Sequence, residues 1–331
     1  MIKRILSRLK MGRIPGFHTL IMDRPLPDFE VATMILSIRA YQKNVGDITL
    51  FADEAGMKWA TKHKIANLYN NVEEMVLDEE IDRRKFWAAG KLEAWARMRA
   101  PCVSVDIDAV LYKKPSMFSD IVALHPEPPN WDVYGLSALR NRVDNLTRLA
   151  CSGPRKPHPP ANVGILCIND DEFRFSYAAY SNTLMLRESC DPFMADDEAI
   201  TINGVPITQM VLAEQYLLSS LATADEKSMS FISDLDVESN HMVPTKAAFH
   251  LWNSKRFYQQ HARAREAYIN HVLEELYTMG AMMDFDVANA VFVNGLPSVR
   301  VVDANSGKAR WSYSGEWTGP GETIKNFGYA N

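Results

Sequence analysis

Short apolar runs alternate with longer amphipathic segments through the first two thirds of the chain. The apolar runs have the length of strands, and the amphipathic segments carry their apolar residues at helical spacing. Strands are expected over 18–23, 47–53, 71–79, 162–169 and 248–252. Helices are expected over 29–43, 54–64, 82–99, 171–180, 211–222 and 258–280, with Asp82 capping the third of them. This alternation predicts an α/β fold, a single domain in which helices flank a mostly parallel central sheet.

Three segments depart from this pattern. Residues 1–16 form a basic leader, which fits either a solvated helix or a short amphipathic helix in weak contact with an anionic membrane. Residues 125–160 are rich in proline and charge, which predicts a loop that covers a binding cleft. Residues 258–331 are expected to form a C-terminal helix and an irregular tail, which leaves 17–257 as the main domain.

Composition excludes several classes of protein. With 47% hydrophobic and 23% charged residues, the 331-residue chain matches an ordinary soluble globular protein. A net charge of -5 argues against a general nucleic-acid binder. No apolar run reaches the roughly 20 residues that span a membrane, so we expect a cytoplasmic protein. The four cysteines lack C-x-x-C spacing, and Cys102 and Cys167 lie in apolar runs, so they are expected to be buried and unpaired.

The stretch VSVDID, residues 103–108, ends an apolar run in two like charges, Asp106 and Asp108. Two carboxylates so close together raise each other's pKa unless a cation or hydrogen bonds compensate them. In an extended chain they point the same way, and the carboxyl end of a strand in an α/β sheet is where ligands bind. Mg²⁺ or Mn²⁺ would accept these oxygen ligands, although a solvated turn explains the tripeptide equally well.

Four segments, one of which contains this motif, carry a resemblance to a known family through their order and spacing. They cover 85–115, 161–166, 213–222 and 249–257. In order and spacing the chain resembles the GT-A-type nucleotide-sugar glycosyltransferases over about residues 17 to 260. It is most similar to uncharacterised glycosyltransferase-like proteins in which a Trp-x-x-x-Lys helix precedes the Asp-x-Asp strand. The resemblance implies a GT-A-like catalytic domain, a Mn²⁺ or Mg²⁺ ion, a nucleoside-diphosphate sugar donor, and transfer with retention to an unknown glycan, lipid or protein acceptor.

The resemblance also implies which residues would meet the metal and the nucleotide. Asp106 would contact the metal or the ribose, while Asp108 and His250 would bind the metal. Lys255 would contact the diphosphate as it leaves, and Asp53 would reach the base or the ribose. Each also has an ordinary structural explanation: a partly buried histidine, a solvated lysine, or an aspartate that caps a helix.

Further residues would face the donor sugar. The resemblance places Lys91 near the sugar or phosphate, and Asn162 and Gly164 along the sugar pocket. Glu214 and Gln215 would face the sugar or the acceptor. On amphipathic helices, Lys91, Glu214 and Gln215 fit exposed surface residues as well.

Two alternatives stay open. VSVDIDAVLY also resembles the first motif of the haloacid-dehalogenase phosphatases, in which Asp106 would accept a phosphoryl group, Asp108 would act as general acid, and Asp170 and Asp171 would supply a later acidic pair. Ala109 stands where that motif has Gly or Thr, which argues against it. The other alternative is a GT-A-like protein that binds a nucleotide or glycan without turnover. No Gly-Gly pair precedes the Asp-x-Asp strand, which leaves the donor sugar open.

Overall fold

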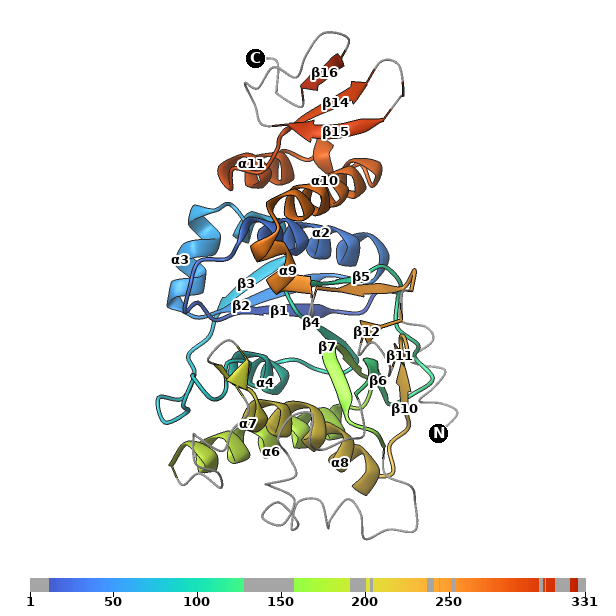
Figure 1. The fold of residues 1–331 in the computed structure, drawn as a ribbon. Helices are drawn as coiled ribbons and strands as arrows, with labels where there is room; N and C mark the ends of the chain where they lie inside the picture. Colours follow the sequence, from blue (N-terminus) through green and yellow to red (C-terminus); the bar gives the residue numbers. More distant parts are fainter. Residues whose placement is uncertain are drawn as a thin grey trace.

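A seven-stranded sheet lies between two layers of helices (Figure 1). The computed structural model describes residues 12–127, 158–190, 201–202, 205–236, 241–243, 245–251, 254–303, 306, 308–312 and 322–326. The strand order is β10-β6-β7-β4-β1-β2-β3. The strands are β1 (Gly16–Leu20), β2 (Ile48–Ala52), β3 (Asn71–Glu74), β4 (Cys102–Val105), β6 (Ile121–Pro126), β7 (Ala161–Ile168) and β10 (Met229–Phe231).

Strand direction confirms the prediction of a mostly parallel sheet. β3, β2, β1 and β4 run parallel to one another, and β10 runs parallel to β6. β7 alone among these strands is antiparallel to both of its neighbours, β4 and β6. β2, β4 and β7 are buried along their whole length, as expected for strands covered on both faces.

Each face of the sheet packs against its own helices. One face is covered by α2 (Asp28–Asn44) and α3 (Glu54–Lys62). The other is covered by α4 (Ala89–Arg97), α6 (Asp171–Cys190), α7 (Thr208–Val211), a π-helix (Leu212–Tyr216) and α8 (Leu217–Ala224). Two separate clusters of buried apolar side chains fill the two interfaces, which makes this a three-layer α/β/α arrangement.

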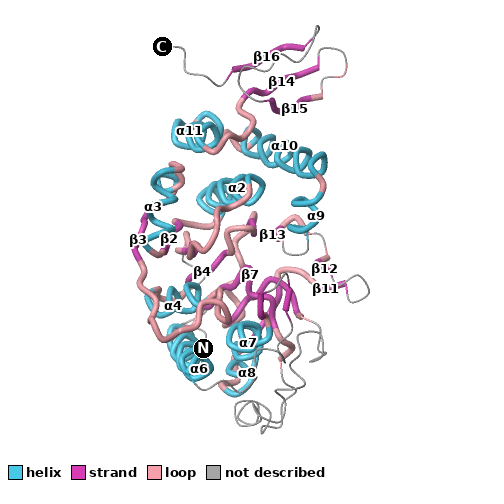
Figure 2. The backbone as a smooth tube through the Cα atoms, turned by 60° about the vertical axis from the view of Figure 1, so that its left-hand side comes forward, coloured by secondary structure: helices cyan, strands magenta, loops and turns pink. Residues whose placement is uncertain are grey.

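Further elements stack on the α2 side (Figure 2). α9 (Lys255–Gln260) leads into α10 (Ala262–Thr278), which packs on α2 beside α11 (Phe285–Val293). Beyond them lies a three-stranded antiparallel sheet of β14 (Val299–Asp303), β15 (Ala309–Ser312) and β16 (Glu322–Asn326). The remaining strands are β5 (Ala109–Leu111) with β13 (Ala248–His250), β8 (Thr201–Ile202) with β9 (Val205–Pro206), and β11 (Leu235–Asp236) with β12 (His241–Met242). Short 3-10 helices span Ala66–Leu68 and Ala281–Met283.

Three expectations from the sequence were wrong. The helix expected from Asp82 begins at Ala89, because Asp82 instead closes a turn in which its carboxylate accepts a bond from Arg84 N at 3.0 Å. The helix expected over 258–280 is two helices, since the backbone at His261 is extended between α9 and α10. The tail is not irregular in its described part, which contains α11 and the three-stranded sheet.

Other expectations fall partly or wholly outside the described residues. These are most of the basic leader, most of the proline-rich segment and Cys151. Cys102 and Cys167 are buried, as expected, and Cys190 is exposed; these three described cysteines form no disulfide with one another. Among the helices of the described residues, none is both long and apolar enough to cross a membrane.

Candidate functional site

The candidate site lies where the central strand β4 ends. β4 is followed by a tight turn in which Asp106 N donates to Gly164 O at 2.7 Å and Ala109 N donates to Asp106 O at 2.9 Å. Asp106 and Asp108 therefore sit together at the carboxyl end of a central strand, as the sequence predicted. This edge is the usual ligand-binding edge of an α/β sheet.

β5 then carries the chain out of this turn and pairs with β13, a strand from far along the sequence. The antiparallel register places His250 opposite Ala109, and Leu251 N donates to Asp108 O at 3.0 Å. The imidazole of His250 consequently lies beside the carboxylate of Asp108, with Nε2 3.7 Å from Oδ2. The structure thus brings His250 to the aspartate pair.

Asp106, Asp108 and His250 form a candidate metal centre. One ligand atom from each residue lies within 4.8 Å of the other two. Both Asp108 and His250 have side chains only 7% exposed, and Nδ1 of His250 makes no hydrogen bond to any described residue. Two carboxylates and an imidazole fit a divalent cation such as Mn²⁺, which accepts mixed oxygen and nitrogen ligands.

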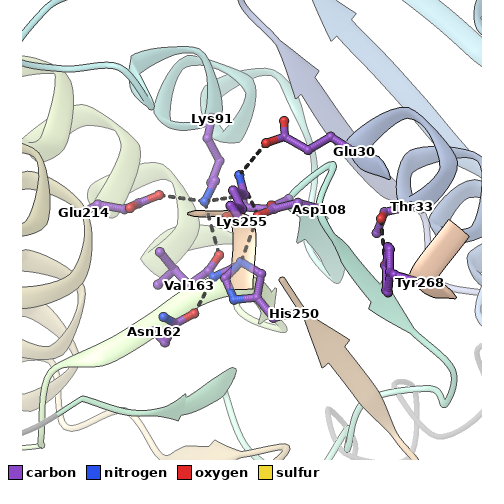
Figure 3. A network of polar contacts seen from close by, with 12 residues as sticks. Glu30, Thr33, Lys91, Asp108, Asn162, Val163, Glu214, His250, Lys255 and Tyr268 are labelled. Carbon is purple, nitrogen blue, oxygen red and sulfur yellow. Dashed lines mark hydrogen bonds and ion pairs between the residues drawn. The ribbon is translucent and has the colours of Figure 1, made fainter. Parts of the chain in front are cut away.

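Lys91 reaches the site from the first turn of α4, and its ammonium points toward Glu214 and Val163 (Figure 3). Its Nζ lies 2.6 Å from Asp106 Oδ1 and 2.8 Å from Glu214 Oε1, and it donates to Val163 O at 3.3 Å. The side chain is 6% exposed, so the exposed-lysine explanation is wrong. Burial alone would lower the pKa of Lys91, but the two carboxylates outweigh it and hold the pKa above its ordinary value.

Lys255 approaches from the other side, at the start of α9. Its Nζ lies 2.7 Å from Asp108 Oδ2 and 3.6 Å from Glu30 Oε1 on α2. Burial would raise the pKa of Asp108, yet Lys255 and His250 together keep that pKa well below its usual range. Asp108 is therefore ionised despite its burial.

Glu214 and Gln215 lie in the π-helix between α7 and α8. Tyr177 Oη donates to Glu214 O at 2.9 Å and Ser181 Oγ donates to Ala213 O at 3.1 Å, so neighbouring side chains satisfy carbonyls of the widened turn. Burial raises the pKa of Glu214, with a contribution from Asp106, and Lys91 opposes the rise. Oε1 of Gln215 is buried without a hydrogen-bond partner among the described residues.

β7 brings Asn162 and Gly164 to the same edge, because an antiparallel strand begins where β4 ends. A Cβ on Gly164 would lie 2.6 Å from His250 Cε1, so only glycine leaves room for this imidazole. Asn162 Nδ2 donates to Glu127 Oε1 at 2.7 Å, and its Oδ1 accepts from Gly164 N at 3.0 Å. Asn162 thus holds the backbone beside His250.

Asp53 makes its contacts outside this group. Its Oδ1 caps α3 by accepting from Gly56 N at 2.8 Å, and it also accepts from Met22 N at 3.3 Å. Oδ2 lies 3.9 Å from Arg83. Asp53 stands at the carboxyl end of β2, and the helix-cap explanation accounts for its contacts.

We call the seven interacting side chains the acid–lysine cluster. Its members are Glu30, Lys91, Asp106, Asp108, Glu214, His250 and Lys255. Sequence reasoning missed Glu30, whose only signal is a carboxylate among the apolar residues of a helix that is buried almost throughout. The four carboxylates of the cluster outnumber its two ammonium groups by two negative charges, which one divalent cation would balance.

Asp170 and Asp171, the later acidic pair of the phosphatase interpretation, are not part of this cluster. They follow the far end of β7, where Asp170 Oδ2 pairs with Lys227 at 2.8 Å and Asp171 accepts from Ala100 N at 2.9 Å. Both lie at the opposite edge of the sheet from Asp106 and Asp108. The structure does not assemble a phosphatase site from them.

Comparison with known proteins gives one family and several distant structural likenesses. A model described as "Family of unknown function (DUF6734)" matches residues 25–283. No curated protein matches the chain.

Three solved structures illustrate the likenesses. The galactosyltransferase LgtC in complex with donor and acceptor sugar analogues matches with a TM-score of 0.37 and 10% identity, over 72% of this chain and 86% of that chain. The PaToxG glycosyltransferase matches with a TM-score of 0.34 and 11% identity, over 89% of this chain and 84% of that chain. The glycosyltransferase GlyE of Streptococcus pneumoniae TIGR4 matches with a TM-score of 0.32 and 10% identity, over 69% of this chain and 46% of that chain. None of these likenesses is close enough to assign an activity to this chain.

Proposed function

The chain belongs to the family of unknown function DUF6734, a membership that assigns no activity, and we propose that it is a metal-dependent glycosyltransferase of the GT-A type. We propose that it moves a sugar from a nucleoside diphosphate to a hydroxyl-bearing acceptor, with retention of configuration. One observation carries the proposal: His250 from β13 meets Asp106 and Asp108 at the end of β4, so that three ligand atoms lie within 4.8 Å of one another.

The cluster supports this chemistry through its charges. A divalent cation held by Asp106, Asp108 and His250 would neutralise the leaving diphosphate. Lys255, 33% exposed beside Asp108, would hold the diphosphate as negative charge develops on it. Lys91 fixes Asp106 and Glu214 relative to each other, since both carboxylates contact one ammonium. In this scheme, Gln215 offers a sugar hydroxyl its amide oxygen, which has no hydrogen-bond partner among the described residues.

The state of Glu214 favours retention. An inverting transferase needs a base, usually a carboxylate, that takes the proton from the incoming acceptor hydroxyl. The side chain of Glu214 is 3% exposed and already ion-paired to Lys91 at 2.8 Å, so it is poorly placed for that task. Transfer on the face of the leaving group, where the diphosphate itself can receive the proton, does not need such a base.

The test combines binding with turnover. Calorimetry with a panel of nucleoside diphosphates, with and without Mn²⁺, should show metal-dependent binding by the parent. Asp108→Asn should weaken that binding by more than the about 10–100-fold typical of losing an outer-shell partner of a metal. Asp47→Asn, an exposed aspartate paired with Arg13, is the matched control and should bind as the parent does.

The outcomes separate the three candidate functions. Hydrolysis of a nucleotide-sugar in Mn²⁺, with a retained anomer by nuclear magnetic resonance, supports the proposal. Binding without any turnover would indicate a nucleotide- or glycan-binding protein. Hydrolysis of a generic phosphomonoester in place of nucleotide-sugars would refute the transferase and favour a phosphatase.

A further inference from the structure

Glu30 is a buried carboxylate that the stability of the fold does not explain. It lies in the first turn of α2, where the helix dipole favours an acidic residue, but a surface carboxylate would gain the same benefit. Its neighbours Phe29, Val31 and Ala32 are buried, and its own side chain is 2% exposed. Oε1 accepts no hydrogen bond from the described residues. Burial of such a charge is costly unless a cation compensates it.

The compensating cation is Lys255, which lies between two carboxylates (Figure 3). Its Nζ is 2.7 Å from Asp108 Oδ2 and 3.6 Å from Glu30 Oε1. Asp108 is also a ligand of the proposed metal centre, so the ammonium and a divalent cation would compete for the same carboxylate. Two cations a few ångströms apart repel each other, and Lys255 needs another partner once Asp108 ligates the metal.

We propose that Glu30 is a positioning residue that receives the ammonium of Lys255 when Asp108 binds the divalent cation. The inference rests on the proposed function and adds a residue to its site. The required movement is small, because shortening 3.6 Å to the about 2.8 Å of a charged hydrogen bond takes less than about 1 Å. Lys255 is the first residue of α9 and 33% exposed, so its side chain can make this shift.

The charge of the acid–lysine cluster supports this role. With Glu30 ionised, the cluster keeps two uncompensated negative charges, equal to the charge of one divalent cation. Replacing Glu30 by neutral glutamine leaves the cluster with one uncompensated negative charge. Metal binding then has to displace an ammonium that has no second carboxylate to accept it.

The experiment is a double-mutant cycle on Mn²⁺ binding without nucleotide, measured by calorimetry and by the spin-resonance signal of free Mn²⁺. The variants are Glu30→Gln, Lys255→Met and the double variant. We expect Glu30→Gln to weaken binding about tenfold, equivalent to about 1.4 kcal/mol. Lys255→Met should tighten binding, because the competing ammonium is gone. In the Lys255→Met background, Glu30→Gln should weaken binding by less than about threefold, since the two residues are coupled.

The control is Asp28→Asn, which removes a carboxylate from the same turn of α2 where it faces Arg265 at 3.7 Å. It should leave Mn²⁺ binding unchanged. If the parent binds no Mn²⁺, the proposed metal centre fails and this inference fails with it. If the parent binds Mn²⁺ and Glu30→Gln binds it equally well, only the inference is wrong.

Two further outcomes would overturn it. Equal losses from Glu30→Gln with and without Lys255 would mean that Glu30 acts on the cation directly and does not position the lysine. If Glu30→Gln fails to fold, the affinity of Lys255→Met for Mn²⁺ tests the proposal instead. An affinity unchanged from the parent would show that Lys255 does not compete with the cation for Asp108, and would overturn the proposal.

Discussion

Lys91 is the residue whose loss should reveal how the site is held together. Its ammonium contacts both Asp106 and Glu214, at 2.6 and 2.8 Å, and its side chain is 6% exposed. Methionine has a similar shape and length but no charge. Lys91→Met therefore leaves two carboxylates facing each other without a cation between them.

The expected cost follows from burial. Removing one partner of a buried ion pair typically destabilises a protein by about 3–5 kcal/mol. Glu214 is 3% exposed and will bear the full effect, whereas Asp106 is 24% exposed and water can partly solvate it. We therefore expect a loss at the lower end, about 3 kcal/mol at neutral pH.

The loss should also depend on pH. Burial and Asp106 already hold the pKa of Glu214 above its ordinary value of 4.5, and removing Lys91 raises it further. Below pH 4.5 Glu214 is protonated in both the folded and the unfolded chain, so this carboxylate adds little to the cost of the substitution. The unfolded chain releases this proton above pH 4.5, but the folded parent also keeps it until the pH passes its own raised pKa. The extra loss caused by the substitution therefore grows only above the parent's raised pKa, where the folded parent has released the proton and the folded variant cannot do so without burying a charge.

Urea unfolding followed by tryptophan fluorescence, at about pH 5 and about pH 8, measures both effects. Lys58→Met is the matched control, because Lys58 pairs with Glu54 at the same 2.6 Å but both side chains are more than 70% exposed. It should unfold as the parent does. A loss for Lys91→Met that is equal at both pH values, or no loss at all, would refute the reasoning from buried charge.

Three other substitutions test other parts of the structure. Gly164→Ala should displace His250, weaken Mn²⁺ binding about tenfold and cost about 1–3 kcal/mol in stability, as calorimetry and urea unfolding would show; unchanged binding would contradict the close approach. Asp108→Asn should lower the melting temperature, because it removes the nearer carboxylate partner of Lys255, at 2.7 Å, and leaves the ammonium with Glu30 at 3.6 Å; an unchanged or raised melting temperature in thermal scans would contradict the stabilising role of this ion pair. His18 is hydrogen-bonded to Tyr69 Oη at 2.7 Å, and burial lowers its pKa to about 3. Below pH 6.5 the unfolded chain therefore binds a proton at His18 that the folded chain does not bind until the pH falls to about 3. His18→Gln should therefore flatten the loss of stability between those pH values in acid titrations; an equally steep loss would exclude His18 as its source.

Much of the sheet could be predicted because its central strands are buried on both faces. β2 and β7 are continuous apolar runs, and their observed bounds lie within a residue of the expected ones. The helix expected from Asp82 failed for a different reason. Its apolar spacing continues through Phe86, but Phe86 N and Lys85 N both bond to Asp82 O in a turn that precedes α4.

Site residues that depart from the usual pattern of buried apolar and exposed charged positions could be predicted from the sequence, whereas a site residue that fits an ordinary pattern could not. Asp106 and Asp108 were visible because two like charges end a buried strand. Glu30 gave no such signal, since an acidic residue in the first turn of a helix is what the helix dipole favours at any surface. Only the packing of α9 and α10 over α2 shows that this carboxylate is buried and faces Lys255.

The direction of β7 argues against one of two interpretations of the same motif. The tripeptide Asp-Ile-Asp is compatible with a metal site for a nucleotide-sugar and with a phosphoryl-accepting aspartate. Because β7 is antiparallel to β4, its first residues, Asn162 and Gly164, meet the aspartates and make room for His250. A parallel β7 would instead end beside them and bring Asp170 and Asp171 to the same edge, as a phosphatase of that kind requires. No local pattern in an apolar eight-residue strand specifies its direction, so this choice became visible only in the pairing of β7 with its neighbours.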